Sequence, residues 1–168
     1  MERALTTERL HLKAIDPADA EVVAPHCAEP AIYRMLTKMP PNQSVADTRA
    51  FLEATAKDRD AHGYTIWAGE EFAGIVSLTR QSHGLYLLGY WSAVSAWGRG
   101  YMTEAAGALR AAFVEETGIG VLQSGYFSDN PASGRVLRKL GFLPCGRQSV
   151  YSLGRDCFVD HQDMVWVS

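Results

Sequence analysis

The sequence has few cysteines and no pattern of metal ligands. Cys27, Cys145 and Cys157 are its three cysteines, they lie far apart, and none belongs to a C-x-x-C pair. This spacing argues against a disulfide framework and against a zinc site, so we expect three packing thiols. The five histidines are equally scattered, with no two at the spacing of metal ligands. The sequence therefore predicts a protein that works without a metal.

Long apolar runs and basic clusters are also missing. No run approaches the roughly 18 apolar residues that a membrane span needs, and the start at Met1-Glu2-Arg3 lacks the apolar core of a signal peptide. The formal net charge is −3, from 16 basic and 19 acidic residues, with no Lys/Arg patch. These features predict a cytoplasmic protein whose main partner is neither a membrane nor a nucleic acid.

What is present is the composition of a folded globular chain. Apolar residues make up 47% of the 168 residues, and no repeat or linker-like segment interrupts them. We therefore expect a single domain over residues 1–168 with a substantial core.

The predicted elements alternate between strands and helices. The expected strands are 10–15, 64–68, 72–78, 85–93, 121–127, 148–153 and 158–167, and the expected helical regions are 16–36, 44–62, 101–117 and 131–140. Short turns make the three middle strands antiparallel, whereas the helical crossover between 85–93 and 121–127 lets those two strands lie parallel. The fold class is therefore α/β (α+β), with a mixed, mainly antiparallel sheet of about seven strands flanked by helices.

Two glycines one residue apart, Gly98 and Gly100, lie between a predicted strand and a predicted helix. Successive backbone N–H groups can converge there, where the helix dipole favours negative charge, so the run predicts a phosphate cradle. The pair resembles a dinucleotide fingerprint without its third glycine, but the preceding hairpins do not fit the βαβ unit of a nucleotide-binding oxidoreductase. A P-loop is excluded, because no Gly-Lys-Ser/Thr follows.

A second helix start lies about 30 residues further on. Asn130 is a typical N-cap and is followed by proline in the first helical position. If strands 85–93 and 121–127 are neighbours, both helix N-termini lie at the same edge of the sheet. Asn130 and Ser133 then lie close to the part of the ligand that extends from a bound pyrophosphate. Taken alone, each is an ordinary residue for the start of a helix.

Taken together, four runs resemble the GNAT superfamily of acetyl-CoA-dependent N-acetyltransferases, in its Rim-type (RimJ/RimL-like) branch. They are Leu-Gly-Tyr-Trp at 88–91, Trp-Gly-Arg-Gly-Tyr-Met-Thr-Glu-Ala-Ala at 97–106, Asp-Asn-Pro-Ala-Ser at 129–133 and Arg-Val-Leu-Arg-Lys-Leu-Gly-Phe at 135–142. The opening run 7–13 fits the same branch. The resemblance covers essentially the whole chain. It implies the GNAT fold with a splayed pair of parallel strands, acetyl-CoA as cosubstrate and no metal.

The resemblance also implies where acetyl-CoA would bind. Its pantetheine arm would pair with the strand edge after Trp91, its pyrophosphate would lie on N–H groups of the glycine run, and Asn130 would hydrogen-bond the pantetheine. Ser133 would lie near the sulfur and is the candidate for polarising or protonating the leaving thiolate. The oxyanion would need N–H donors from the strand edge near Ser92. The implied cofactor-binding set is Trp91, Ser92, Val94, Trp97, Gly98, Arg99, Gly100, Tyr101, Met102, Thr103, Asn130 and Ser133.

The chain departs from the family pattern where a general base is expected. Many Rim-type members have a glutamate two residues before the Gly-Tyr-Trp run, and Leu87 stands there in this sequence. The base stays open among water, His83 and Tyr126, or the amine arrives already neutral. Met102 also departs from the usual small residue and is expected to crowd the cradle. We expect Glu104 to complement the helix dipole.

The acceptor is less well defined than the cosubstrate. Candidate lining residues are Tyr33, Trp67, Tyr90, Trp91 and Tyr151, with 39–44 as a lid. The predicted function is transfer of an acetyl group from acetyl-CoA to a primary amine, either a protein N-terminus or a small-molecule amine. The alternative is an acyl-CoA-binding sensor without catalysis. The oligomeric state stays open, with a homodimer as the arrangement common in this family.

Overall fold

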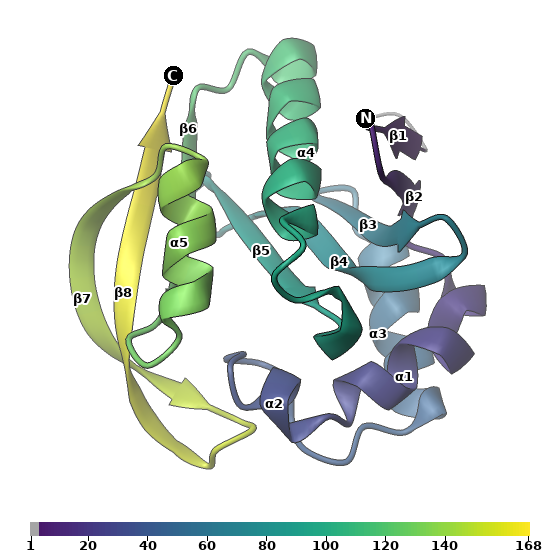
Figure 1. The fold of residues 1–168 in the computed structure, drawn as a ribbon. Coiled ribbons are helices and arrows are strands. Elements are labelled where there is room, and N and C mark those ends of the chain that lie inside the picture. The colour runs from purple at the N-terminus through teal and green to yellow at the C-terminus, as the bar shows by residue number, and fades with distance from the viewer. Residues whose placement is uncertain (1–3) are drawn as a thin grey trace.

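The computed structural model describes residues 4–168 and is built around one open, twisted sheet with helices on both faces (Figure 1). Its strands are β1 (Ala4–Thr6), β2 (His11–Ala14), β3 (Ala61–Ala68), β4 (Glu71–Arg80), β5 (Tyr86–Ser92), β6 (Val121–Phe127), β7 (Leu143–Ser152) and β8 (Cys157–Val167). Its helices are α1 (Ala20–Cys27), α2 (Pro30–Tyr33), α3 (Val45–Lys57), α4 (Tyr101–Thr117) and α5 (Pro131–Lys139), with short 3-10 turns at Pro17–Asp19 and Val94–Ala96. Among the described residues no helix has the length and apolar character of a membrane span.

The sheet confirms the predicted mixed fold. The strand order is β1-β2-β3-β4-β5-β6-β8-β7, and every neighbouring pair is antiparallel except β5 and β6. Within residues 4–168 the sheet has eight strands rather than seven. The additional strand β1 has only three residues, which is too short to show an alternating pattern in the sequence.

The parallel strands β5 and β6 are paired only at their beginnings. The register contains Tyr86 opposite Leu122 and Leu87 opposite Gln123. Beyond these pairs, a hydrogen bond of 2.8 Å from the Ser124 hydroxyl to the Leu88 carbonyl still joins the two strands. The remaining residues of β5 and β6 diverge and leave a V-shaped opening in the sheet. This is the splayed parallel pair that the sequence resemblance implied.

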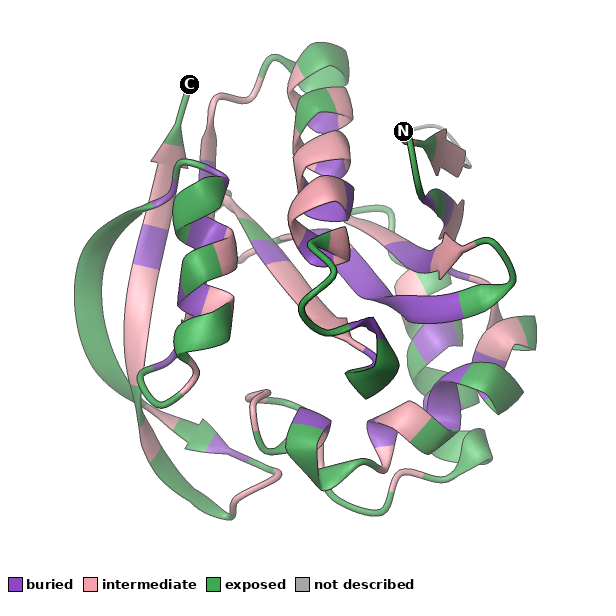
Figure 2. Cartoon of the chain, in the orientation of Figure 1, coloured by how far each residue is buried: buried purple, intermediate pink, exposed green. Residues whose placement is uncertain are grey.

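The core lies mainly between the sheet and α4 (Figure 2). One face of α4 carries Met102, Ala105, Leu109 and Phe113, all buried, as its period of 3.6 residues predicts. Gly118 ends this helix in the left-handed conformation at φ +69°, which glycine adopts without a steric penalty. The predicted bounds of α4 are therefore confirmed.

The early helices differ from the prediction. Region 16–36 is a 3-10 turn followed by two short helices, and Pro30 begins the second of them, because proline interrupts a helix but suits its first turn. Helix α3 ends at Lys57 rather than near residue 62. Within α3, Thr48 and Leu52 are buried, whereas Val45 and Phe51 are exposed. Strand β7 also begins earlier than expected, at Leu143.

Candidate active site

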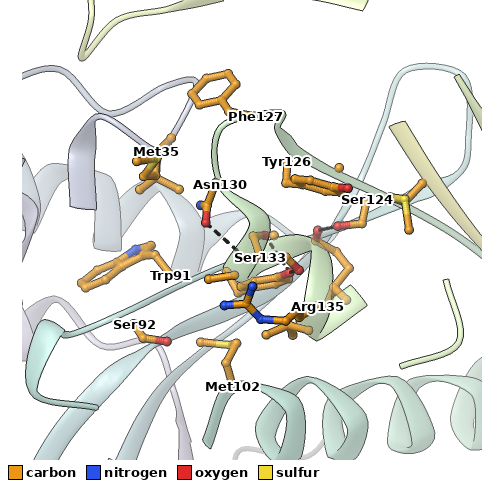
Figure 3. A pocket seen from close by; sticks show the side chains of 18 of the residues that line it. Met35, Trp91, Ser92, Met102, Ser124, Tyr126, Phe127, Asn130, Ser133 and Arg135 are labelled. Atoms are coloured by element: carbon orange, nitrogen blue, oxygen red, sulfur yellow. Dashed lines mark hydrogen bonds between the residues drawn. The ribbon is translucent and has the colours of Figure 1, made fainter. Parts of the chain in front are cut away.

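A deep cleft opens where β5 and β6 diverge (Figure 3). Its volume is about 1160 Å³, and its walls come from both strands, the β7–β8 hairpin, the segment 31–37 and the first turns of α4 and α5. Residues from both faces of β5 line it: Tyr90 contacts α5, whereas Trp91 packs against Phe72 on the opposite face. The cleft therefore crosses the sheet, and two molecules can meet inside it from opposite sides.

The start of α4 forms the predicted cradle at this cleft. Gly98 and Gly100 have φ of +75° and +77°, which bends the chain so that its N–H groups face outward before the helix begins. No N–H group from Gly98 to Thr103 has a hydrogen-bond partner within residues 4–168. A Cβ at Gly98 would meet no atom within 4 Å, so the space in front of the turn is open. This arrangement suits an anion with several oxygens.

The N-terminal run 7–13 holds this cradle in place. The Arg9 guanidinium donates to the Glu104 carboxylate at 2.7 Å and to the Arg99 carbonyl at 3.0 Å. It also stacks on Tyr101, 5.0 Å from the ring centre. Burial raises the pKa of Glu104, but hydrogen bonds from Thr7 and Arg9 outweigh it and hold the pKa below its usual value. Glu104 thus anchors the turn through an ion pair in addition to its expected place near the helix N-terminus.

The start of α5 brings Asn130 and Ser133 to the same cleft. The Asn130 side-chain oxygen accepts the Ser133 N–H at 3.2 Å, which confirms the predicted N-cap. The Ser133 hydroxyl lies 2.9 Å from the hydroxyl of Tyr90 on β5, and the Ser133 carbonyl lies 3.1 Å from it. Burial raises the pKa of Tyr90 to about 12, although its hydrogen bond with Ser133 acts in the other direction. Tyr90 therefore stays protonated and can donate to Ser133.

The expected cofactor-binding residues line the cleft, with two exceptions. The side chain of Val94 is exposed in its 3-10 turn, and that of Arg99 pairs with Glu71 on β4 at 3.2 Å. Trp97 donates its indole N–H to the Ser92 carbonyl at 3.1 Å and so closes the loop that precedes the cradle. Met102 is 7% exposed, packs in the core and also lines the cleft, so the expectation that it crowds the cradle stays a prediction.

The expected acceptor residues are only partly correct. Of the five candidate aromatic residues, Tyr90 and Trp91 line the cleft, while Tyr33, Trp67 and Tyr151 do not. The segment 31–37 lines it, whereas the predicted lid at 39–44 does not. Sequence patterns could not show which of these residues line the cleft, because the path of the short helix α2 depends on tertiary contacts.

One such contact comes from Arg155 at the tip of the β7–β8 hairpin. Its guanidinium donates to the Asp129 carboxylate at 2.6 Å and to the carbonyl of Arg34, which follows α2. It also lies over the Phe127 ring, 5.0 Å from the centre. The hairpin thereby ties the segment after α2 to the end of β6 and encloses the cleft on the face opposite α4 and α5.

A histidine that sequence reasoning missed lines the same face. His161 on β8 lies with Nδ1 at 2.8 Å from the Asp163 carboxylate, and Gln148 on β7 donates to the same carboxylate oxygen at 2.8 Å. All three residues line the cleft. The available signal was the spacing of two residues between His161 and Asp163, because alternate residues of a strand share one face. Among the described residues no group of His, Cys, Asp and Glu could hold a metal ion.

Comparison with known proteins adds a family assignment and a set of similar folds to this geometry. The model of the acetyltransferase (GNAT) domain family matches residues 9–143. A search of curated proteins found no match.

Solved structures share the fold at low sequence identity. RimL, a ribosomal L7/L12 alpha-N-protein acetyltransferase in complex with coenzyme A, has a TM-score of 0.86 at 20% identity, over 97% of this chain and 96% of that chain. The microcin C7 self-immunity acetyltransferase MccE, with acetyl-CoA and AMP, has a TM-score of 0.85 at 18% identity, over 96% and 94%. Spermidine N-acetyltransferase from Vibrio cholerae, with CoA and spermine, has a TM-score of 0.81 at 14% identity, over 96% of both chains.

Proposed function

The chain belongs to the GNAT acetyltransferases, and we propose that it transfers the acetyl group of acetyl-CoA to a primary amine by direct attack. The observation that carries this proposal is the row of N–H groups from Gly98 to Thr103, which have no hydrogen-bond partner within residues 4–168, at the mouth of a cleft that crosses the sheet. The family model stops at residue 143, but β7 and β8 complete the cleft. This supports a single domain over residues 1–168.

The residues of the cleft fit acetyl-CoA in three places. The N–H groups of the glycine run would hold the pyrophosphate, and the cations Arg135 and Lys139 on α5 line the cleft and would attract its charge. The diverging edge of β5 around Ser92 would pair with the pantetheine arm. Asn130 and Ser133 would lie along that arm, with the Ser133 hydroxyl polarising the leaving thiolate. A serine hydroxyl is a weak acid, so its contribution is a hydrogen bond to developing negative charge.

The acceptor side of the cleft favours an amine with a single positive charge. Asp163 is the one carboxylate among the described residues that line the cleft, and the segment 31–37 supplies apolar side chains beside it. A polyamine would leave further ammonium groups without a partner, at a cost of several kcal/mol for each buried charge. We therefore favour a protein N-terminus or a small monoamine over a substrate of the spermidine type. The name of RimL as an alpha-N-protein acetyltransferase supports the first of these.

A matched pair of glycine variants tests the cradle. Gly100→Ala places a Cβ in front of the N–H row, 3.6 Å from the Arg9 guanidinium, at a residue with φ +77°. Gly69→Ala imposes comparable backbone strain at φ +63°, in the remote β3–β4 turn. We expect Gly100→Ala to weaken acetyl-CoA binding at least tenfold, about 1.4 kcal/mol, and Gly69→Ala to leave it unchanged. Isothermal titration measures both, and equal affinities in the two variants would contradict the cradle.

Turnover separates the enzyme from the sensor. The sensor alternative rests on Leu87, which leaves the family's usual base position without an acid. Thiol release from acetyl-CoA should be followed with peptides that carry free N-termini, with monoamines and with spermidine. Release with at least one amine supports the enzyme. Binding of acetyl-CoA without release on any amine supports the sensor, and no binding at millimolar acetyl-CoA contradicts both.

A further inference from the structure

We propose that His161 is the general base that takes the proton from the acceptor amine, and that Asp163 and Gln148 hold its ring in the required orientation. This inference rests on the proposed function, because it names the group that makes the attacking nitrogen neutral. It also supplies a candidate for the base. The sequence alone left the base unassigned, because Leu87 stands where many family members have an acidic residue.

The position of His161 is fixed by the register of three strands. Gly125 on β6 lies opposite Asp163 on β8, and Gln148 on β7 lies opposite His161. The imidazole covers Gly125 so closely that a Cβ there would come within 2.2 Å of Cε1 and 2.8 Å of Nε2. Only glycine leaves room for the ring in this place. The imidazole therefore lies over β6, next to the gap between β6 and β5.

The hydrogen bonds select the tautomer that a base requires. A carboxylate can only accept, so the 2.8 Å contact with Asp163 places the proton of neutral His161 on Nδ1. Nε2 then carries the free lone pair, and it has no hydrogen-bond partner among residues 4–168. The donation from Gln148 to the same Asp163 oxygen fixes the carboxylate in turn. A base oriented by a third group is the arrangement found in catalytic triads.

The surroundings of the ring contain few competing charges. Asp163 is the charged group in direct contact with it, and the Phe127 ring separates it from the Arg155–Asp129 ion pair. On the other walls, β5 presents Leu87, Gly89 and Trp91, and the residues of segment 31–37 that line the cleft are uncharged. Arg34 in that segment does not line the cleft and acts on Asp129. The remaining titratable groups that line this side are Cys145 on β7 and His83 before β5.

The other candidates for the base are placed less well. His83 is exposed, and its Nδ1 accepts the Leu85 N–H within the turn before β5. The Tyr126 ring lies on the opposite face of β6, packed against Gly134 of α5. Its hydroxyl accepts a weak contact from Arg138 at 3.5 Å. Within the described part of the chain, neither residue has a second group that orients it toward the gap.

The proton balance of the reaction is complete with these groups. The ammonium gives one proton to Nε2 of His161, and the neutral nitrogen forms its bond to the thioester carbon. As the C–S bond breaks, the nitrogen loses a second proton and the thiolate gains one, which yields the amide and the free thiol of CoA. His161 returns its proton to solvent through the open acceptor side, so one proton is released in each turnover.

The test compares pH profiles of kcat/KM in the wild type and four variants (His161→Gln, Asp163→Asn, His83→Gln and His11→Gln), with the best amine found for the wild type. His161→Gln should lower kcat/KM near neutral pH by about 10²- to 10⁴-fold, while acetyl-CoA affinity stays within about twofold. The deficit should shrink at high pH, where more of the amine arrives neutral. Asp163→Asn should shift the acidic limb of the profile, a change that a purely structural role would not produce. His11→Gln is the control, because His11 is exposed on β2 and does not line the cleft.

The outcomes separate this inference from the proposed function. An unchanged profile in His161→Gln, or loss of the acidic limb in His83→Gln instead, overturns the assignment of the base while acetyl transfer stands. If no amine is acetylated, nitrogen NMR of the His161 imidazole with CoA bound still tests which ring nitrogen carries the proton. Protonation of neutral His161 on Nδ1 agrees with the proposal, and protonation on Nε2 overturns it.

Discussion

Tyr90→Phe is the most informative single substitution outside the base, because it removes one oxygen atom and almost no volume. The Tyr90 hydroxyl has one proton and two acceptors within reach, the Ser133 hydroxyl at 2.9 Å and the Ser133 carbonyl at 3.1 Å. If Tyr90 donates to the hydroxyl, the proton of Ser133 is free to reach the leaving sulfur. If Tyr90 donates to the carbonyl, the proton of Ser133 points back to Tyr90. The raised pKa of Tyr90, about 12, keeps its proton available in either arrangement.

The expected loss of stability follows from one hydrogen bond. Such a bond contributes about 0.5–1.5 kcal/mol net. The groups on Ser133 face the cleft, where water can replace the lost donor, so the loss should stay near 1 kcal/mol. For a chain of 168 residues this lowers Tm by about 2–4 °C. The phenylalanine ring fills the same space, so no term for a cavity is added.

The kinetic effect decides whether the bond serves catalysis. If Tyr90 polarises the Ser133 hydroxyl, Tyr90→Phe should lower kcat about tenfold, or 1.4 kcal/mol, with acetyl-CoA affinity unchanged. The double variant with Ser133→Ala should then be no slower than Ser133→Ala alone, because the two residues act on the same proton. Thiol release and thermal melting of the four proteins measure both quantities. If the losses in kcat of the two single variants add in the double variant, or if Tyr90→Phe lowers Tm but not kcat, Tyr90 does not act in catalysis through Ser133.

Two further predictions concern thiols and acid stability. Burial raises the pKa of Cys27 to about 11, whereas Cys145 and Cys157 are exposed. A thiol reagent at neutral pH should therefore modify two cysteines in the native protein and the third only after unfolding; rapid reaction of all three would contradict this. The hydrogen bond from Arg155 holds the pKa of Asp129 below its usual 3.8, against a smaller effect of burial. Its stabilisation is therefore present above this value and lost as the pH falls through the folded pKa, so the difference in Tm between wild type and Asp129→Asn should narrow below about pH 3.8. A difference that is constant across the acid range would show that the ion pair does not stabilise the fold.

The parts of the site that could be predicted from sequence are those set by local backbone chemistry. The glycines at both ends of α4 have positive φ, and Asn130 caps α5, as their residue types indicate. The crossover helix between β5 and β6 made the parallel pair expected, although not how soon the two strands diverge. These features need only a few neighbouring residues, so one sequence was enough to place them.

The parts that could not be predicted depend on which distant segments meet. Arg9 reaches Glu104 across 95 positions, and Arg155 reaches the carbonyl of Arg34 across 121. His161 becomes a candidate base only through the register that lays its ring on Gly125. In the sequence it is one scattered histidine among five. A pattern with a period of two places His161 and Asp163 on one face, but it cannot say which strand they will face.

The divergence of β5 and β6 connects the two groups proposed to move protons, which lie on opposite faces of the sheet. Consecutive residues of a strand point to opposite faces, so Tyr126 packs against α5 while Gly125 lies beneath His161. The Tyr90–Ser133 pair and the His161–Asp163 pair are therefore on opposite sides of the same gap. A thioester held in that gap would have a proton acceptor on the side where the amine enters and a hydroxyl on the side where the sulfur departs. If the gap were closed by a full ladder of hydrogen bonds, the sheet would separate these groups. The short register of two residue pairs is therefore what the proposed direct transfer requires of the sheet.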